Sequence, residues 1–132
     1  MKKIQLLSVL LLMAAVGFTG CHKTVEPKVS TVSISDITPY SCYAKGVVLQ
    51  DGGADVAECG FCWDTQEDPG VTNEFVACSS GLGYYIGKIA GLEEGTTYYL
   101  RAYAVNEAGI GYGEVVSFTT KTSEEGDDTA IP

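Results

Sequence analysis

The sequence is short of the residues on which most catalytic and nucleic-acid-binding sites depend. It has a single histidine, His22, and its 8 basic residues face 17 acidic ones, for a formal net charge of −9 over 132 residues. A lone histidine next to the N-terminal segment is a poor general base, so no nucleophilic triad can be assembled. An acidic chain also lacks the basic surface that binds phosphates. We therefore predict no enzymatic activity and no nucleic-acid partner.

Cofactor and metal motifs are also missing. The glycine-rich stretch 81–87 lacks the spacing of a dinucleotide loop, and no strand–turn–helix pattern surrounds it. Acidic residues gather at Asp64, Glu67 and Asp68, where a weakly bound calcium ion is one interpretation and a solvated turn is the other. The prediction is no cofactor and no metal site.

Beyond the N-terminal segment the chain has no long apolar run and no helical spacing of apolar residues. Its apolar residues alternate in short runs between turn residues, which is typical of strands. Strands are predicted at residues 31–37, 41–49, 56–63, 73–79, 84–90, 97–106 and 114–121. Seven short antiparallel strands predict an all-β fold, a β-sandwich of two sheets.

The one long apolar run lies at the N-terminus and has the parts of a secretory signal. Lys2 and Lys3 precede an apolar stretch at residues 6–16, and small residues follow. The end of this stretch, "FTGC", resembles a bacterial lipobox, which implies cleavage after residue 20 and lipid attachment, including palmitate, at Cys21. An ordinary signal cleaved nearby, leaving Cys21 as a free thiol, is the alternative. Removal of residues 1–20 makes the net charge −11, since it removes two lysines and no acid.

The remaining chain divides into three parts. Residues 21–29 are polar and predict a tether, and residues 30–121 hold all the predicted strands. Residues 122–132 are rich in acids and predict a disordered tail.

The stretch "GLEEGTTYYLRAYAVNEAGIGYGEVVSFTT", residues 91–120, carries a family resemblance. Leu92, Gly95, Thr96 and Tyr98, followed by "RAYAVN", resemble the C-terminal half of a fibronectin type III domain. The match is best to the variant found in many surface or periplasmic lipoproteins of Gram-negative gut bacteria. The resemblance implies an immunoglobulin-like sandwich of seven strands in which the Tyr98 hydroxyl bonds upstream backbone, the tyrosine corner. It also implies that Tyr98, Leu100, Ala102 and Ala104 point into the core.

The motif "CGFC", Cys59–Cys62, suggests redox or zinc chemistry, but it lies within a predicted strand. Residues three apart on a strand face opposite sides, so these two sulfurs cannot readily share a metal or pair with each other. Because export permits disulfides, we predict the pairs Cys42–Cys62 and Cys59–Cys78 among the three connectivities of these four cysteines. Buried free thiols are the alternative.

One further feature is a candidate interaction face. Tyr99, Arg101 and Tyr103 share the outward phase of the predicted strand 97–106, where they could form a platform for a protein or a sugar ring. Cross-strand packing alone could also explain them. The sequence thus predicts a lipid-anchored fibronectin type III-like module of the cell envelope, an outer membrane lipoprotein compatible with a periplasmic or a surface orientation. Its predicted role is protein interaction or structural assembly, and the alternative is glycan capture at the cell surface.

Overall fold

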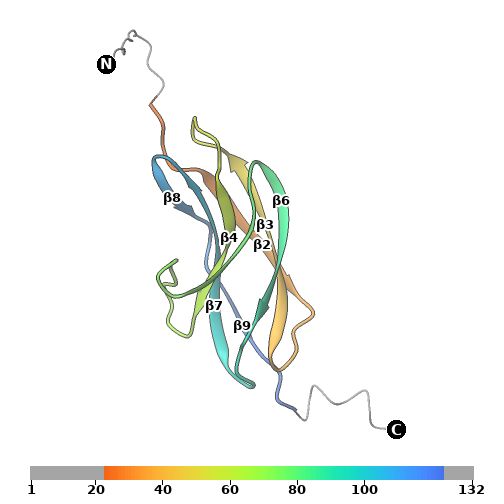
Figure 1. Cartoon of the computed structure of the whole chain (residues 1–132). Helices are drawn as coiled ribbons and strands as arrows, with labels where there is room; N and C mark the ends of the chain where they lie inside the picture. Colours follow the sequence, from red (N-terminus) through yellow and green to blue (C-terminus); the bar gives the residue numbers. More distant parts are fainter. Residues whose placement is uncertain (1–22, 124–132) are drawn as a thin grey trace, which may run out of the picture.

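In the computed structural model, residues 23–123 are described, and they form two β-sheets packed face to face (Figure 1). The predictions for the signal peptide, for Cys21 and for residues 124–132 lie outside these residues. The strands are β2 (Lys28–Ser35), β3 (Ser41–Gln50), β4 (Glu58–Asp64), β5 (Glu74–Ser79), β6 (Gly83–Ala90), β7 (Thr97–Asn106), β8 (Gly109–Tyr112) and β9 (Val116–Thr119). Within residues 23–123, no helix is long and apolar enough to cross a membrane.

All strand pairs are antiparallel. One sheet has three strands in the order β2-β3-β6, and the other has five, in the order β5-β4-β7-β8 with β9 also paired to β7. The predicted all-β sandwich is therefore confirmed, with eight strands in the described chain rather than seven. The additional strand is β8, which pairs with the C-terminal part of β7 while β9 pairs with its N-terminal part. From the sequence alone, residues 109–112 are predicted as part of a turn. The reason is that the strand found there is only four residues long and contains two glycines.

The core lies between the two sheets and follows the expected alternation. Tyr98, Leu100, Ala102 and Ala104 of β7 are all buried, so the predicted inward phase of this strand is confirmed. Opposite them, β3 and β6 contribute the buried residues Cys42, Ala44, Val48, Tyr85 and Ile89. This period of two is what places one face of each strand in the core and leaves the other face outside.

The centre of the core is an aromatic pair. Phe61 of β4 is fully buried, and its ring centroid lies 5.0 Å from that of Tyr85. The glycines around it make room for these rings, since a Cβ built on Gly87 would lie 2.4 Å from the Cys78 sulfur and 3.1 Å from Phe61. The Tyr85 hydroxyl donates to the Gly60 carbonyl at 2.8 Å, which satisfies a polar atom inside the core.

The N-terminal segment is attached to the domain before β2 begins. The Val25 amide donates to the Gly52 carbonyl at 2.9 Å, and the Asn106 side-chain amide donates to the carbonyls of Val25 (2.7 Å) and Asp51 (2.8 Å). Pro27 and Val29 are buried. The predicted tether, residues 21–29, therefore ends too late, because the backbone from Val25 onward is hydrogen-bonded to or packed against the domain.

Thr31 joins the two sheets at the break between β8 and β9. Its hydroxyl accepts from the Ala102 amide of β7 (2.9 Å) and donates to the Glu114 carbonyl (2.7 Å). The Glu114 carboxylate accepts in turn from the Thr31 amide at 3.0 Å and from the Ser30 hydroxyl. Thr31, from the three-stranded sheet, thus accepts a backbone hydrogen bond of β7 at the point between β8 and β9 where the strand ladder of the other sheet is interrupted.

Glu114 gives this junction a pH dependence. Hydrogen bonds from its own backbone amide, from the Thr31 amide and from the Ser30 hydroxyl lower the pKa of its carboxyl group below 4.5. A carboxyl whose pKa is lower in the folded state stabilises the fold above its unfolded pKa, and this contribution disappears as the pH falls through the folded pKa. We expect the difference in unfolding free energy between wild type and Glu114→Gln to shrink between about pH 6 and about pH 3, measured by urea denaturation. An unchanged difference would contradict the assignment.

Candidate functional site: the outer faces of the two sheets

Tyr98 makes the contact expected of a corner tyrosine. Its hydroxyl accepts from the Glu93 amide at 2.9 Å, five residues upstream, and its ring stacks on Phe118 with centroids 5.8 Å apart. The side chain is buried. Tyr98 is therefore a structural residue that fixes the turn before β7, and its hydroxyl already has a partner within the chain.

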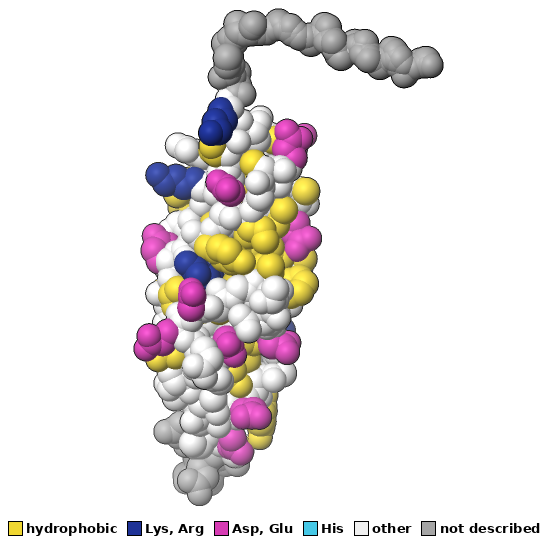
Figure 2. Space-filling view, turned by 90° about the vertical axis from the view of Figure 1, so that its left-hand side faces the viewer, with side chains coloured by type: hydrophobic (Ala, Val, Ile, Leu, Met, Phe, Trp, Pro, Cys, Tyr) yellow, Lys and Arg dark blue, Asp and Glu magenta, His cyan; other side chains and the backbone are white. Residues whose placement is uncertain are grey.

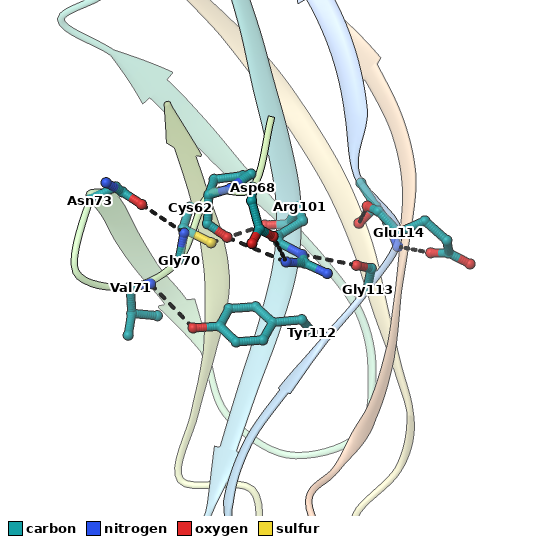
Figure 3. A network of polar contacts seen from close by, with 11 residues as sticks. Cys62, Asp68, Gly70, Val71, Asn73, Arg101, Tyr112, Gly113 and Glu114 are labelled. Carbon is teal, nitrogen blue, oxygen red and sulfur yellow. Dashed lines mark hydrogen bonds and ion pairs between the residues drawn. The ribbon is translucent and has the colours of Figure 1, made fainter. Parts of the chain in front are cut away.

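Arg101 fastens the loop between β4 and β5 to the outer face of the five-stranded sheet (Figure 3). Its guanidinium donates to the Gly113 carbonyl at 3.1 Å, to the Pro69 carbonyl at 3.4 Å and to the Asp68 carboxylate at 3.2 Å. The guanidinium carbon also lies 4.7 Å from the centre of the Tyr112 ring, a cation–π contact. Arg101 is thus occupied by contacts within the chain.

The contacts of Arg101 also give one residue of the acidic turn Asp64, Glu67 and Asp68 a partner within the chain. Asp68 forms the ion pair with Arg101, although 94% of its side chain is exposed, which limits the strength of the pair. In the described part of the chain, no three His, Cys, Asp or Glu side chains form a group that could hold a metal ion.

The burial of Tyr103 contradicts the predicted interaction platform of Tyr99, Arg101 and Tyr103. Tyr103 is only 1% exposed, and its hydroxyl donates to the Glu58 carboxylate at 2.5 Å. The ring of Phe75, on β5, packs edge-on against it with centroids 6.3 Å apart. Burial and the Glu58 contact both raise the pKa of Tyr103. With Tyr103 covered, Arg101 occupied and Tyr99 half-buried, these three residues do not form an exposed platform, because the neighbouring strand and loop pack over them.

The exposed aromatic residues of this side are instead Phe75, 50% exposed, and Tyr112, 38% exposed. Figure 2 shows the side on which β8 and the loop between β4 and β5 lie in Figure 1, and hydrophobic side chains gather there at mid-height beside charged ones. Both aromatics have roles within the fold. Phe75 covers Tyr103, and the Tyr112 hydroxyl accepts from the Val71 amide at 3.3 Å. The main role of this surface is therefore to cover the outer face of the five-stranded sheet.

The four described cysteines are free thiols. Cys62 pairs with Arg101 in the sheet and lies outside the core cluster that contains Cys42, so the two sulfurs are on opposite faces of the five-stranded sheet. The predicted Cys42–Cys62 disulfide is therefore wrong, because β4 turns Phe61, not Cys62, toward the core. Cys59 and Cys78 do lie on the core side of neighbouring strands, next to a register shift after Cys59, but they are not bonded to each other.

Thiol labelling tests this arrangement. Burial raises the pKa of Cys42, Cys62 and Cys78 to about 11, so all three react slowly in the folded protein. Cys78 is only half-buried, and we expect it to be alkylated before the other two. After denaturation without reductant, intact-mass measurement should find four alkylated residues among Cys42, Cys59, Cys62 and Cys78. A mass showing two unmodified residues would establish a disulfide and contradict the structure.

The most exposed apolar surface lies on the three-stranded sheet. On the outer face of β3 and β6, Tyr84 is 71% exposed, Ile86 63% and Tyr43 40%. The register sets these residues in rows that cross the sheet. They are Ser35–Tyr43–Lys88, Ser33–Lys45–Ile86 and Ser30–Val47–Tyr84. We call the residues Tyr43, Lys45, Val47, Tyr84, Ile86 and Lys88 the β3–β6 face. Serines occupy the β2 side of each row, so the apolar side chains are concentrated toward β6.

The β3–β6 face also differs in charge from the rest of the chain. Its only charged residues are Lys45 and Lys88, whereas the whole protein has a net charge of −9. The Lys45 ammonium lies 5.0 Å from the centre of the Tyr84 ring, which holds the two side chains together without removing either from solvent. The face therefore combines exposed aromatic and aliphatic area with positive charge.

Sequence reasoning missed this face although its signal was present. Tyr85 and Ile89 are buried apolar residues of an alternating strand, and the same alternation places Tyr84, Ile86 and Lys88 outside. What the sequence could not supply was the pairing that puts Tyr43 and Lys45 beside them and leaves them uncovered.

Comparison with known proteins defines the fold. No protein-family model matches the chain, and a comparison with curated protein sequences finds no match either. Solved structures do match. The FN1-FN3 domains of chicken CNTN1 match with a TM-score of 0.58 at 17% identity, over 76% of this chain and 33% of that one. The 6th fibronectin type III domain of human fibronectin type III domain containing protein 3 matches with a TM-score of 0.50 at 27% identity, over 82% of this chain and 92% of that one.

A bacterial structure is similar as well. The sensor domain of the anti-sigma factor RsgI4 from Pseudobacteroides cellulosolvens matches with a TM-score of 0.52 at 16% identity, over 76% of this chain and 99% of that one. Together these structures define a fibronectin type III-like, immunoglobulin-like β-sandwich. Domains of this fold generally serve in protein interaction or assembly and are typically not catalytic.

Proposed function

We propose that the protein is a lipid-anchored, non-catalytic interaction module of the bacterial cell envelope. Its anchor is the lipid on Cys21, and its working part is the fibronectin type III-like sandwich. The fold supports a role in binding or assembly, and the lipobox-like "FTGC" supports the anchor. The outer membrane is the proposed location, with the periplasmic and surface orientations both compatible with the sequence.

One observation carries the interaction role. The β3–β6 face exposes Tyr84, Ile86 and Tyr43 side by side, and no other described element packs on it. Aromatic and aliphatic side chains grouped in this way are typical of protein-binding surfaces, where Tyr residues contribute much of the affinity. By contrast, the outer face of the other sheet uses its polar groups within the chain.

Site-specific photo-crosslinking in intact cells tests this role. A photoreactive phenylalanine analogue at Tyr84 is expected to yield a discrete adduct, either of two copies of this chain or of this chain with another protein. The same analogue at Thr119, an exposed residue of β9, serves as the matched control and should yield none. Adducts at neither position, or equal adducts at both, would reject the β3–β6 face as the binding surface.

The anchor is tested separately. Metabolic labelling with palmitate should mark the wild-type protein and not Cys21→Ser, and the variant should leave the membrane fraction. Several acyl chains bind a bilayer stably, because each buried methylene contributes about 0.8 kcal/mol. Protease treatment of intact cells then separates the surface from the periplasmic orientation.

Glycan capture is the second candidate, and the exposed Tyr84 and Tyr43 rings are the observation that favours it. Sugar rings stack on such aromatics, but the predicted Tyr99 and Tyr103 platform is no longer available for this purpose. A glycan array probed with wild type and with Tyr84→Ala distinguishes the two functions. Binding that is lost in Tyr84→Ala would favour glycan capture over protein interaction.

A further inference from the structure

The four edges of the two sheets differ in how well they are protected against pairing with another strand. The β2 edge carries two register shifts against β3, and the β5 edge lies opposite a shift between Cys59 and Gly60. The fourth edge is divided between β8 and β9, each only four residues long. Bulges and short strands are the features by which edges resist pairing.

The β6 edge has none of these features. Its eight residues, Gly83–Ala90, pair with β3 in one unbroken register, and no strand of residues 23–123 is hydrogen-bonded to its other side. It contains no proline and no acid, and Lys88 is its only charged residue. An exposed, regular edge with apolar residues at Tyr84 and Ile86 is a template for a further strand.

We propose that the occupant of this edge is a second copy of the same chain, paired antiparallel through β6 to form one continuous six-stranded sheet. In the proposed register a two-fold axis passes beside Ile86, so that each Ile86 faces Ile86 of the second copy. A contact of this kind is isologous and closes as a dimer. The inference deepens the proposed function, on which it rests, by naming the partner of the β3–β6 face.

Side-chain chemistry selects this register. Directly opposed residues of a pair share a face, so only registers that match outward with outward residues are allowed. With Ile86 on the axis, Lys88 lies opposite the exposed Tyr84 ring of the second copy, a cation–π arrangement like the one Lys45 already makes with Tyr84. The two Lys88 residues are then four positions apart, about 13 Å at 3.3 Å per residue. An axis at Gly87 would bring them closer.

The charge balance makes the dimer dependent on concentration. A chain of net charge −9 repels its own copy at long range, although the paired strands carry no acid. Attachment to one membrane, as in the proposed function, would raise the effective concentration of the chains and offset this repulsion.

Sedimentation velocity of the mature chain carrying Cys21→Ser tests dimerisation. We expect a monomer–dimer equilibrium whose dissociation constant rises by about tenfold or more in Ile86→Lys, since two like charges then face each other on the axis. Ile86 is 63% exposed, so this change costs the fold little even though Lys45 lies opposite it on β3. Val32→Lys, at a 45% exposed residue of β2, is the matched control and should dimerise like wild type. A monomer at all concentrations, or equal losses in both variants, would overturn the proposal.

Disulfide trapping tests the register. Ile86→Cys should give a covalent dimer on oxidation, whereas Val32→Cys should not. A mixture of Tyr84→Cys and Lys88→Cys should cross-link to each other. If Ile86→Cys fails to cross-link in a protein that dimerises, pairing through β6 is wrong. Tyr84 adducts in cells that are larger than two copies of this chain, combined with a monomer in solution, would refute the dimer. The proposed interaction role would still stand.

Discussion

Replacing Asn106 with alanine is expected to lower the free energy of unfolding by about 2–4 kcal/mol, because four hydrogen bonds of one buried side chain are lost at about 1 kcal/mol each. Its amide nitrogen holds the Val25 and Asp51 carbonyls, and its oxygen accepts from the amides of Ala108 (2.8 Å) and Gly109 (3.2 Å). Urea denaturation measures the change. The hydrogen-exchange rate of the Val25 amide should also rise.

Asn106→Asp is the matched variant. It keeps the oxygen that accepts from the β7–β8 turn and loses both donors to Val25 and Asp51. We expect the turn amides of Ala108 and Gly109 to stay protected in Asn106→Asp and to exchange faster in Asn106→Ala, while Val25 exchanges faster in both. Protection of Val25 that is unchanged in either variant would show that Asn106 does not hold the N-terminal segment.

Replacing Phe61 with alanine is expected to cost more, about 3–5 kcal/mol of unfolding free energy, because the cavity left by a buried aromatic ring adds to the lost transfer energy. Phe61 is fully buried, and it contacts Tyr85 in the middle of the core. Denaturation of the purified protein measures the loss. If the alanine variant is too unstable to purify, Phe61→Leu should show a smaller loss of the same sign.

Phe75→Ala is the control for this prediction. Phe75 is the same residue type, but it is 50% exposed and covers Tyr103 from outside the core. Its loss should cost about 1 kcal/mol or less, which is the range of one exposed aromatic contact. Comparable losses at Phe61 and Phe75 would contradict the assignment of the core to the space between the sheets.

Residues that alternate could be placed from the sequence, since a strand has only two faces and apolar residues decide which one is buried. The sandwich class followed from that rule, and the inward phase of β7 was implied by the resemblance to fibronectin type III domains. The orientation of Cys62 could not be predicted from that rule, because β4 is buried on both faces where the loop carrying Pro69 packs over this strand. A pattern read along one strand gives no information about a loop that returns to cover it.

The outer faces show the same limit. Tyr103 and Tyr84 have the same residue type and the same outward phase, yet one is 1% exposed and the other 71%. The difference comes from their neighbours. Phe75 and Glu58 cover Tyr103, whereas Tyr84 lies on β6, which pairs with one strand, β3, in the described part of the chain. Strand order, which local sequence does not determine, decides which outward tyrosine is available to a partner.

The Thr31 junction has a mechanical consequence. The described chain enters at one end of the sandwich and leaves at the other (Figure 1), so tension between its ends would act along the strands. Such tension would shear β2 against β3, loading many hydrogen bonds together instead of opening them one by one. Thr31, bonded to Ala102 and Glu114, would transfer part of this load from β2 to the opposite sheet. A sandwich fastened in this way resists extension along its length, which would suit the proposed lipid anchor at one end of the domain.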